Sequence, residues 1–267
     1  MSKIKIDAYS LLQKIKMQKP LVHHLTNWVT IYDCANIVKV LGGSPVMAHA
    51  KEEVAEMAKI ASALILNIGT LTVDFIEAMK IAAQSANEKG IPVVLDVCGA
   101  GATHLRDEAS FSLLGSVKID IIKGNASEIA RITGEKVKTK GVDAGTVEKD
   151  MLLIAKRLAK KRQCTVVITG KEDIIVDTQK HYIVKNGHEL MTHVVGTGCM
   201  AASVIGVFAA VDRNLAYAAT AALVVFEVAA QLAAEKSKGP AAFKNALFDC
   251  LFNLDKQTVE KMQNVSQ

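Results

Sequence analysis

The sequence predicts an α/β fold with a central, mostly parallel sheet, helices on both faces, an antiparallel edge hairpin and a C-terminal helical cluster. Half of the residues are apolar but only 4% are aromatic, so Ala, Val, Ile and Leu build most of the core. Short apolar runs rich in β-branched side chains alternate with longer helical patterns. Strands that lack polar alternation are buried on both faces, which is typical of a parallel sheet covered by helices.

The first half of the chain contains three of the expected strands. They are Ala63–Ile68, Pro92–Val97 and Lys118–Lys123. A helical pattern over Leu71–Lys89 separates the first two, and Gly90 marks its end because glycine readily takes the left-handed conformation that closes a helix.

The pattern of the second half changes from alternating strands and helices to helices alone. An amphipathic helix over Val147–Arg162 precedes a fourth strand, Thr165–Thr169, and a hairpin follows over Asp173–Asp177 and His181–Lys185. The C-terminal helices are expected at Cys199–Ala210, Leu215–Ala234 and Ala241–Thr258. Because no repeat or linker divides the chain, we expect a single domain over residues 1–267.

Charge and cysteine content exclude several classes of protein. Lys and Arg number 32 against 27 Asp and Glu, a net charge of +5 without a basic block, so we expect a small anionic ligand and no nucleic acid. Five scattered cysteines without a C-x-x-C pair indicate a reducing cytoplasm. Polar residues interrupt Leu215–Ala234, which favours a buried helix, and we expect no membrane association.

Candidate functional residues gather where strands end, because ligands of such sheets bind beyond the carboxyl ends of the strands. The strongest of these segments is Gly196-Thr197-Gly198-Cys199, which opens a helix. Glycines let the backbone approach a ligand, and the first amides of a helix bind anions. We therefore predict an anion site here, with a positive φ at Gly198, against the alternative of an ordinary turn.

A second group of candidates contains three oxygen ligands. Asn125 and Glu128 lie one turn apart at a helix start, and Asp96 ends a neighbouring strand. Such oxygens suit Mg²⁺, but the N-x-x-E spacing by itself favours helix capping. The chain contains no P-loop motif, no complete dinucleotide fingerprint, and no zinc-protease or α/β-hydrolase motif.

Taken together, the motifs resemble those of the hydroxyethylthiazole kinase family, in order and over nearly the whole chain. They are Pro45-Val46-Met47-Ala48, Leu66–Leu71, Asp96 with Gly99–Thr103, Lys123–Glu128, Val167–Gly170 and Gly196–Cys199. The resemblance implies a ribokinase-like fold and ATP-dependent, Mg²⁺-assisted phosphorylation of 4-methyl-5-(2-hydroxyethyl)thiazole in thiamine biosynthesis or salvage. It also implies a homotrimer with active sites between subunits.

The resemblance also implies a role for each matching residue. Met47, Gly196, Asn27 and Gly69 would line the thiazole pocket, Lys123 and Thr169 would contact ATP, Asp96, Asn125 and Glu128 would hold Mg²⁺, and Gly198, Thr197 and Cys199 would act at the reacting groups. Two positions depart from the family pattern. Asp96-Val97-Cys98-Gly99 replaces Asp-Pro-Val-Gly, and Lys123 stands where many members have Arg.

Three alternatives remain open at the level of sequence. Cys199 is either a base for the substrate hydroxyl or a small packing residue. The chain could be a related kinase of another small alcohol, such as a hydroxymethylpyrimidine, although such relatives generally carry Asp at the Cys199 position. It could also be a sensor that binds a thiazole or a nucleotide without turnover.

Overall fold

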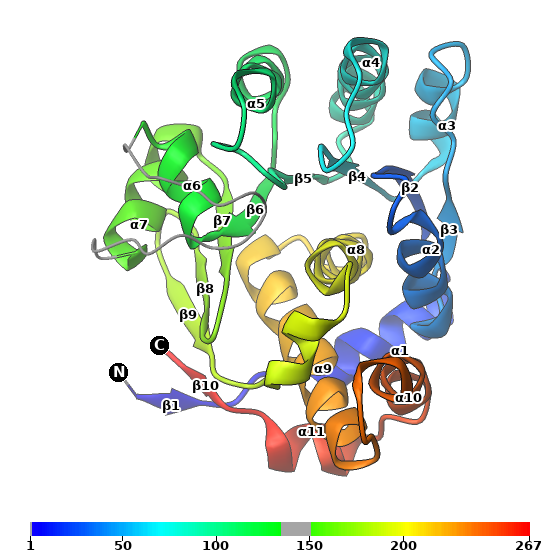
Figure 1. The fold of residues 1–267 in the computed structure, drawn as a ribbon, viewed down its shortest axis with the longest axis vertical. Coiled ribbons are helices and arrows are strands. Elements are labelled where there is room, and N and C mark those ends of the chain that lie inside the picture. The colour runs from blue at the N-terminus through cyan, green and yellow to red at the C-terminus, as the bar shows by residue number, and fades with distance from the viewer. Residues whose placement is uncertain (1, 135–150) are drawn as a thin grey trace.

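The computed structural model describes residues 2–134 and 151–267, and within them ten strands form one sheet (Figure 1). The strands are β1 (Lys3–Ile4), β2 (Leu21–Leu25), β3 (Ser44–Val46), β4 (Ala63–Asn67), β5 (Val93–Asp96), β6 (Ile121–Asn125), β7 (Thr165–Thr169), β8 (Asp173–Val176), β9 (His181–Val184) and β10 (Val265–Ser266). Their spatial order is β1-β10-β9-β8-β7-β6-β5-β4-β2-β3. The six strands from β7 to β3 are parallel, and the remaining pairs are antiparallel.

Helices cover both faces of the sheet, as the sequence predicts (Figure 1). One face packs against α3 (Val54–Ile60), α4 (Val73–Lys89), α5 (His104–Ser116), α6 (Ala126–Ile132) and α7 (Met151–Arg162). The core on the other face includes α1 (Ala8–Gln18), α2 (Ile31–Val40), α8 (Thr197–Ala209) and α9 (Leu215–Glu235). Helices α10 (Pro240–Phe252) and α11 (Lys256–Met262) pack against these helices, and the short 3₁₀ helix η1 (Glu189–His193) precedes α8.

Successive side chains of a central strand belong to different cores because they alternate between the faces of the sheet. Leu64 and Leu66 of β4 pack with the α3–α7 layer, whereas Ile65 between them packs under α8 and α9. The strands are therefore apolar at nearly every position. Helix α9 is long and apolar enough to cross a membrane, but 78% of its most apolar window is buried, so it is a core helix as predicted.

Most predicted elements are confirmed, with two differences. The strand expected at Lys118–Lys123 begins only at Ile121 and ends at Asn125, and the Asp120 side chain just before it accepts a hydrogen bond from the backbone amide of Val93 (3.0 Å). The single helix expected at Ala241–Thr258 is wrong: α10 ends at Phe252, and Asp255 caps a new helix by accepting from the amide of Thr258 (2.8 Å). The first part of the helix expected at Val147–Arg162 lies outside the described residues.

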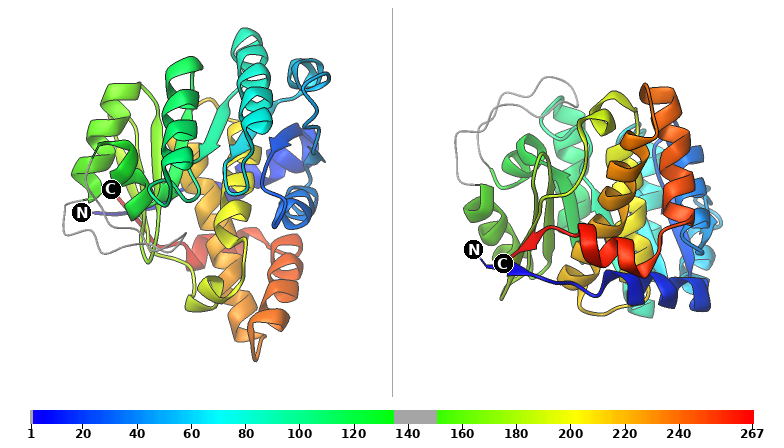
Figure 2. Two further views of the ribbon diagram at one scale, coloured as in Figure 1. Left: turned by 45° about the horizontal axis from the view of Figure 1, so that its top comes forward. Right: turned by 90° about the horizontal axis from the view of Figure 1, so that it is seen from below.

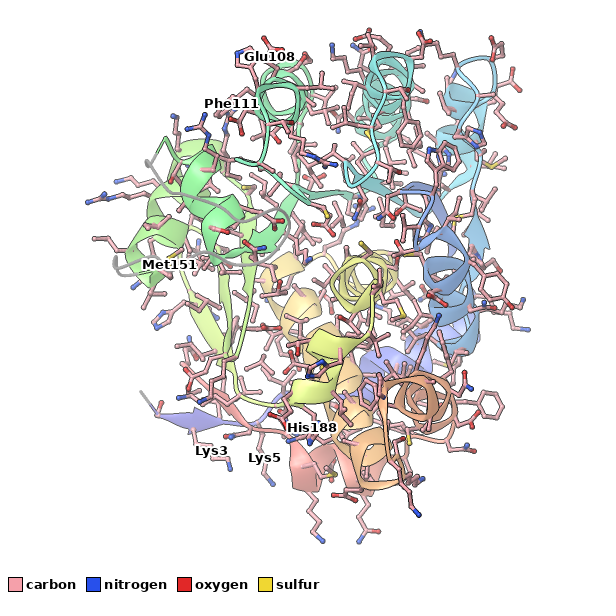
Figure 3. All side chains as sticks on the ribbon, viewed as in Figure 1. Lys3, Lys5, Glu108, Phe111, Met151 and His188 are labelled. Carbon is pink, nitrogen blue, oxygen red and sulfur yellow. The ribbon has the colours of Figure 1, made fainter. Side chains whose placement is uncertain are left out.

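The antiparallel edge of the sheet is larger than the predicted hairpin of β8 and β9. Strands β10 and β1 extend it, so the two ends of the chain lie side by side (Figure 2). These two strands have only two residues each, too few to show a sequence pattern. The side chains of Lys3 and Lys5 project from this edge into solvent, where charge discourages pairing with another chain (Figure 3).

Candidate active site

Polar side chains from three neighbouring strands meet at the carboxyl end of the sheet. Asn67 of β4 is in register with Asp96 of β5, and Asp96 is in register with Lys123 of β6. Residues that are in register on parallel strands point to the same face. All three are at most 4% exposed, and they lie under the N-terminus of α8.

Lys123 connects this group to the first turn of α8. Its Nζ atom lies 3.3 Å from Asp96 Oδ2, and a Cβ added to Gly198 would be 3.3 Å from the same nitrogen. Glycine at position 198 therefore leaves the space that the ammonium group occupies. Burial disfavours the charge of Lys123, but Asp96, Glu128 and Cys199 outweigh this and raise its pKa.

Asp96 has one carboxylate oxygen in use and one without a partner. Asn67 Nδ2 donates to Oδ2 at 2.8 Å, while Oδ1 is buried and has no hydrogen-bond partner in the described parts of the chain. Burial raises the pKa of Asp96 to about 8. The positive charge of Lys123 lowers this pKa, whereas the negative charges of Cys199 and Glu128 raise it further. One buried ammonium thus faces three acidic groups, an arrangement that suits a further cation.

Cys199 lies in the first turn of α8 among hydrogen-bond donors. Asn27 Nδ2 donates to its Sγ atom at 3.1 Å, and Asn67 Nδ2 does so at 3.4 Å. The interaction with the Cys98 thiol and the charge of Lys123 outweigh burial and lower the pKa of Cys199 to about 5, which favours the thiolate at neutral pH.

Asn27 and Asn67 hold each other in place beside this sulfur. Asn27 Nδ2 donates to Asn67 Oδ1 at 3.0 Å, and that oxygen also accepts from the amide of Gly69 at 2.9 Å. The Oδ1 atom of Asn27 accepts from both the amide (3.1 Å) and the hydroxyl (3.0 Å) of Thr30. The structure thus brings Asn27, Gly69 and Cys199 together through Asn67.

Glu128 joins the start of α6 to the loop after β5. Its Oε2 atom accepts from the amide of Asn125 at 2.7 Å, and Asn125 Oδ1 accepts from the amide of Glu128 at 3.0 Å, which is the predicted capping box of α6. Its Oε1 atom accepts from the amide of Gly99 at 2.7 Å, in the loop after β5. Burial raises the pKa of Glu128. Capping is therefore confirmed.

The two glycines at the start of α8 differ in backbone conformation. Gly196 has the positive φ, +97°, and a Cβ added there would lie 2.6 Å from Thr30 Cγ2. Gly198 lies inside the helix, so the expected positive φ at that position is wrong. The Thr197 hydroxyl donates to the carbonyl of Met191 at 2.9 Å, so it fastens η1 to the start of α8.

Two predicted residues lie at the same edge of the sheet but outside this hydrogen-bonded group of described residues. Met47 follows β3 and is half-buried. Thr169 ends β7, where it is in register with Asn125. Both residues therefore lie at the carboxyl ends of their strands, where ligands of such sheets bind.

Sequence reasoning did not assign roles to Asn67, Cys98 or Arg106. Arg106 of α5 donates to the carbonyls of Ile68 (2.7 Å), Cys98 (3.0 Å) and Gly69 (2.7 Å), and so clamps the loops after β4 and β5 together. A usable signal for Asn67 was its position as the last residue of a strand, shortly before a glycine, because Asp96 also ends a strand and is followed by a glycine three residues later. Nothing local distinguishes Arg106 from other helix arginines.

A sequence model of the hydroxyethylthiazole kinase family matches residues 12–257 of this chain. The chain belongs to the hydroxyethylthiazole kinase family. The resemblance of the sequence motifs is therefore confirmed. A hydroxyethylthiazole kinase of Methanosarcina acetivorans is 56% identical over 256 residues, which make up 96% of this chain and 98% of that protein.

Solved structures agree with this membership. A hydroxyethylthiazole kinase protein from Pyrococcus horikoshii OT3 is 38% identical and superposes with a TM-score of 0.90 over 97% of this chain and 98% of that chain. A ribokinase-like superfamily protein from Enterococcus faecalis superposes with a TM-score of 0.65 at 13% identity, over 94% of this chain and 98% of that chain. The latter similarity shows the fold alone, and the fold is ribokinase-like as predicted.

Proposed function

We propose that this kinase transfers the γ-phosphoryl group of ATP to the hydroxyl of 4-methyl-5-(2-hydroxyethyl)thiazole, in thiamine biosynthesis or salvage. The observation that carries the proposal is the meeting of Lys123 and Cys199 at the N-terminus of α8. The first amides of a helix have no acceptor within the helix and favour an anion. A cation, an anion site and a proton acceptor thus lie together, and the positioning and charge stabilisation that they offer suit phosphoryl transfer.

In the proposed reaction, the substrate hydroxyl attacks the γ-phosphorus, a new P–O bond forms and the bond to ADP breaks. The amides of Gly196–Gly198 hold the transferring group, and the Lys123 ammonium neutralises the charge of the nucleotide. The hydroxyl proton passes to the Cys199 thiolate, which the donors from Asn27 and Asn67 hold in place. Protein groups therefore act mainly by positioning and by electrostatic stabilisation.

The residues of the site fit Mg²⁺. Oδ1 of Asp96 is a buried carboxylate oxygen without a partner in the described part of the chain. Asp96 would hold the ion, and Asn125 and Glu128 would order its waters. When bound, Mg²⁺ neutralises phosphate charge and orients the phosphate oxygens.

The remaining predicted residues complete the two binding sites. Met47, Asn27, Gly69 and Gly196 would line the thiazole pocket, because they lie at the ends of neighbouring elements around Cys199. Thr169 and Lys123 would contact ATP across the ends of β7 and β6. The free cysteines among the described residues are compatible with a reducing cytoplasm, where we place the reaction.

We also propose a homotrimer whose active sites lie between subunits. Two segments that border the site expose apolar side chains, the one after Asn27 and the one before Gly196. The exposed fractions are 48% for Trp28, 67% for Val29, 77% for Tyr32 and 73% for Val195. Exposed apolar groups of this size next to a ligand site are typical of a subunit interface. Light scattering should give three times the chain mass of 28.6 kDa, and a mass of one chain would contradict the trimer.

The test of the function is ADP release with the thiazole alcohol, with a hydroxymethylpyrimidine and with neither, over a titration of Mg²⁺. We expect Mg²⁺-dependent turnover with the thiazole alcohol, reduced about 100-fold or more in Asp96→Asn. Asp120→Asn is the matched control, because Asp120 lies at the amino end of β6, away from the site, and bonds to Val93. Faster turnover of the pyrimidine, or thiazole binding without turnover, would contradict the proposal.

A further inference from the structure

A half-buried arginine of α5, Arg106, joins the loops after β4 and β5. Its Nη1 atom donates to the carbonyl of Ile68 at 2.7 Å and to that of Cys98 at 3.0 Å, and its Nη2 atom donates to the carbonyl of Gly69 at 2.7 Å. Each of these carbonyls lies in a loop and needs a donor, and one planar guanidinium group supplies all three. The guanidinium group therefore fixes the distance between the two loops. No step of the proposed phosphoryl transfer uses it.

The loop after β5 is shaped around this guanidinium group. Gly99 has a positive φ, +80°, and a Cβ added there would lie 2.9 Å from Nη1 of Arg106. The amide of Gly99 donates to Glu128 Oε1 at 2.7 Å, and the amide of Gly101 donates to Asp107 Oδ1 at 2.7 Å. Side chains of α5 and α6 thus hold this loop at three points. Of these three side chains, only that of Arg106 also bonds to the loop after β4.

The two loops carry residues of the two proposed binding sites. Gly69 lies beside Asn27 in the proposed thiazole pocket, and Asp96 immediately precedes the loop at which we place Mg²⁺ and the phosphates. Arg106 approaches from α5, on the face of the sheet opposite α8, and bonds to backbone carbonyls (Figure 1). It therefore acts through the loops and not on the reacting atoms. Phosphoryl transfer needs these atoms about 3–3.5 Å apart, and a displacement of about 1 Å can cost about 100-fold in rate.

We propose that Arg106 is a positioning residue that sets the separation of the alcohol-binding loop from the phosphate-binding loop, and so aligns the substrate hydroxyl with the γ-phosphorus. The identity of the two sites rests on the proposed function. Without the clamp, each substrate still binds to its own loop but lies at the wrong distance from the other, so the loss falls on kcat. An arginine that only stabilised the fold would change the fraction of folded protein and leave the kcat of folded molecules unchanged.

Arg106→Lys keeps the positive charge but loses the planar fork that donates in several fixed directions. Arg213→Lys is the matched control, because Arg213 also donates to a backbone carbonyl, that of Gly90 at 2.8 Å, but does so before β5 at the amino end of the sheet. Both kinetic constants are measured for each substrate at a temperature where circular dichroism shows every protein folded. In Arg106→Lys we expect kcat to fall about 10–100-fold, with both KM values within about threefold of the parent. In Arg213→Lys we expect neither constant to change.

Hydrogen exchange followed by mass spectrometry measures the clamp without any assay of activity. In Arg106→Lys we expect faster exchange in the peptides that cover residues 68–70 and 97–102, because both loops open more often, and unchanged exchange in β7. Failure of the proposed function would appear in the parent, as absent turnover of the thiazole alcohol, and the exchange readout would still stand. An unchanged kcat of the folded variant, a loss confined to KM, or unchanged exchange in both loops would overturn the inference about Arg106.

Discussion

Glu128→Gln distinguishes what this carboxylate does for the fold from what it does for Mg²⁺. Glu128 is 5% exposed, and each of its two oxygens accepts a backbone amide, from Gly99 and from Asn125. Glutamine keeps one oxygen and presents an NH₂ group in place of the other. Either the loop after β5 or the N-terminus of α6 therefore loses its acceptor.

The expected loss of stability follows from these two bonds. A buried backbone amide left without an acceptor costs about 1–3 kcal/mol. The hydrogen bond that remains also becomes weaker, because the neutral oxygen of glutamine replaces a charged carboxylate oxygen as the acceptor. Relief of the desolvation that raises the pKa of Glu128 offsets part of this. We expect a net loss of about 2 kcal/mol, which lowers the melting temperature by roughly 4–8 °C in a domain of this size.

Thermal unfolding followed by circular dichroism measures this loss. Asp255→Asn is the control, because Asp255 also caps a helix, α11, but does so at an exposed position. This substitution should lower the melting temperature much less, because Asn caps a helix about as well as Asp does. An unchanged melting temperature in Glu128→Gln, or equal shifts in the two variants, would refute the reasoning.

Activity measured at several Mg²⁺ concentrations then separates the two roles. If Glu128 orders the waters of the ion, the variant needs more Mg²⁺ for half-maximal turnover even at temperatures where it is fully folded. If it acts only as a cap, the Mg²⁺ dependence of the folded variant equals that of the parent.

Three further predictions concern the start of α8 and the buried carboxyl groups of Asp173 and Glu227. Gly196→Ala should lose about 2–4 kcal/mol in urea unfolding, because its positive φ is strained for alanine and its Cβ would clash with Thr30; an unchanged stability would contradict this. If Cys199 is the base, Cys199→Ala should lose about 10²–10⁴-fold in turnover with thiazole affinity kept, and Cys199→Asp should stay active; an Ala variant within a few-fold of the parent would leave Cys199 as a packing residue. Burial and the neighbouring Asp173 raise the pKa of Glu227 well above its usual value, so the folded protein holds a proton that the unfolded chain releases. Stability should therefore fall above about pH 4.5, by up to about 1.4 kcal/mol per pH unit, and Glu227→Gln should lose this dependence in urea unfolding at several pH values. Parallel pH profiles of the two proteins would contradict it.

Local patterns in the sequence determined the class of fold and most of its elements. Apolar runs predict strands such as Ala63–Asn67 and Thr165–Thr169, because a strand buried on both faces must be apolar throughout. Gly90 marks the end of α4 because its left-handed conformation, with φ at +74°, suits glycine. The N-x-x-E spacing predicts the capping box of α6 because its two partners, Asn125 and Glu128, lie within one helical turn.

The candidate site was predictable to the extent that its residues stand at strand ends and helix starts. Asp96, Lys123 and Cys199 could be named from such positions, but the contacts between them could not. Their distances depend on the register of neighbouring strands and on where α8 packs, and neither leaves a periodic signal along the chain.

Only the tertiary structure decided the contacts between segments that are distant in sequence. The bonds of Asn67 to Asp96 and to Cys199 each need separate elements to converge. The pairing of β10 with β1 is likewise invisible to a pattern, because two residues cannot show alternation. Hydrophobic periodicity and capping act over a few residues, whereas register and packing are settled by the whole core at once.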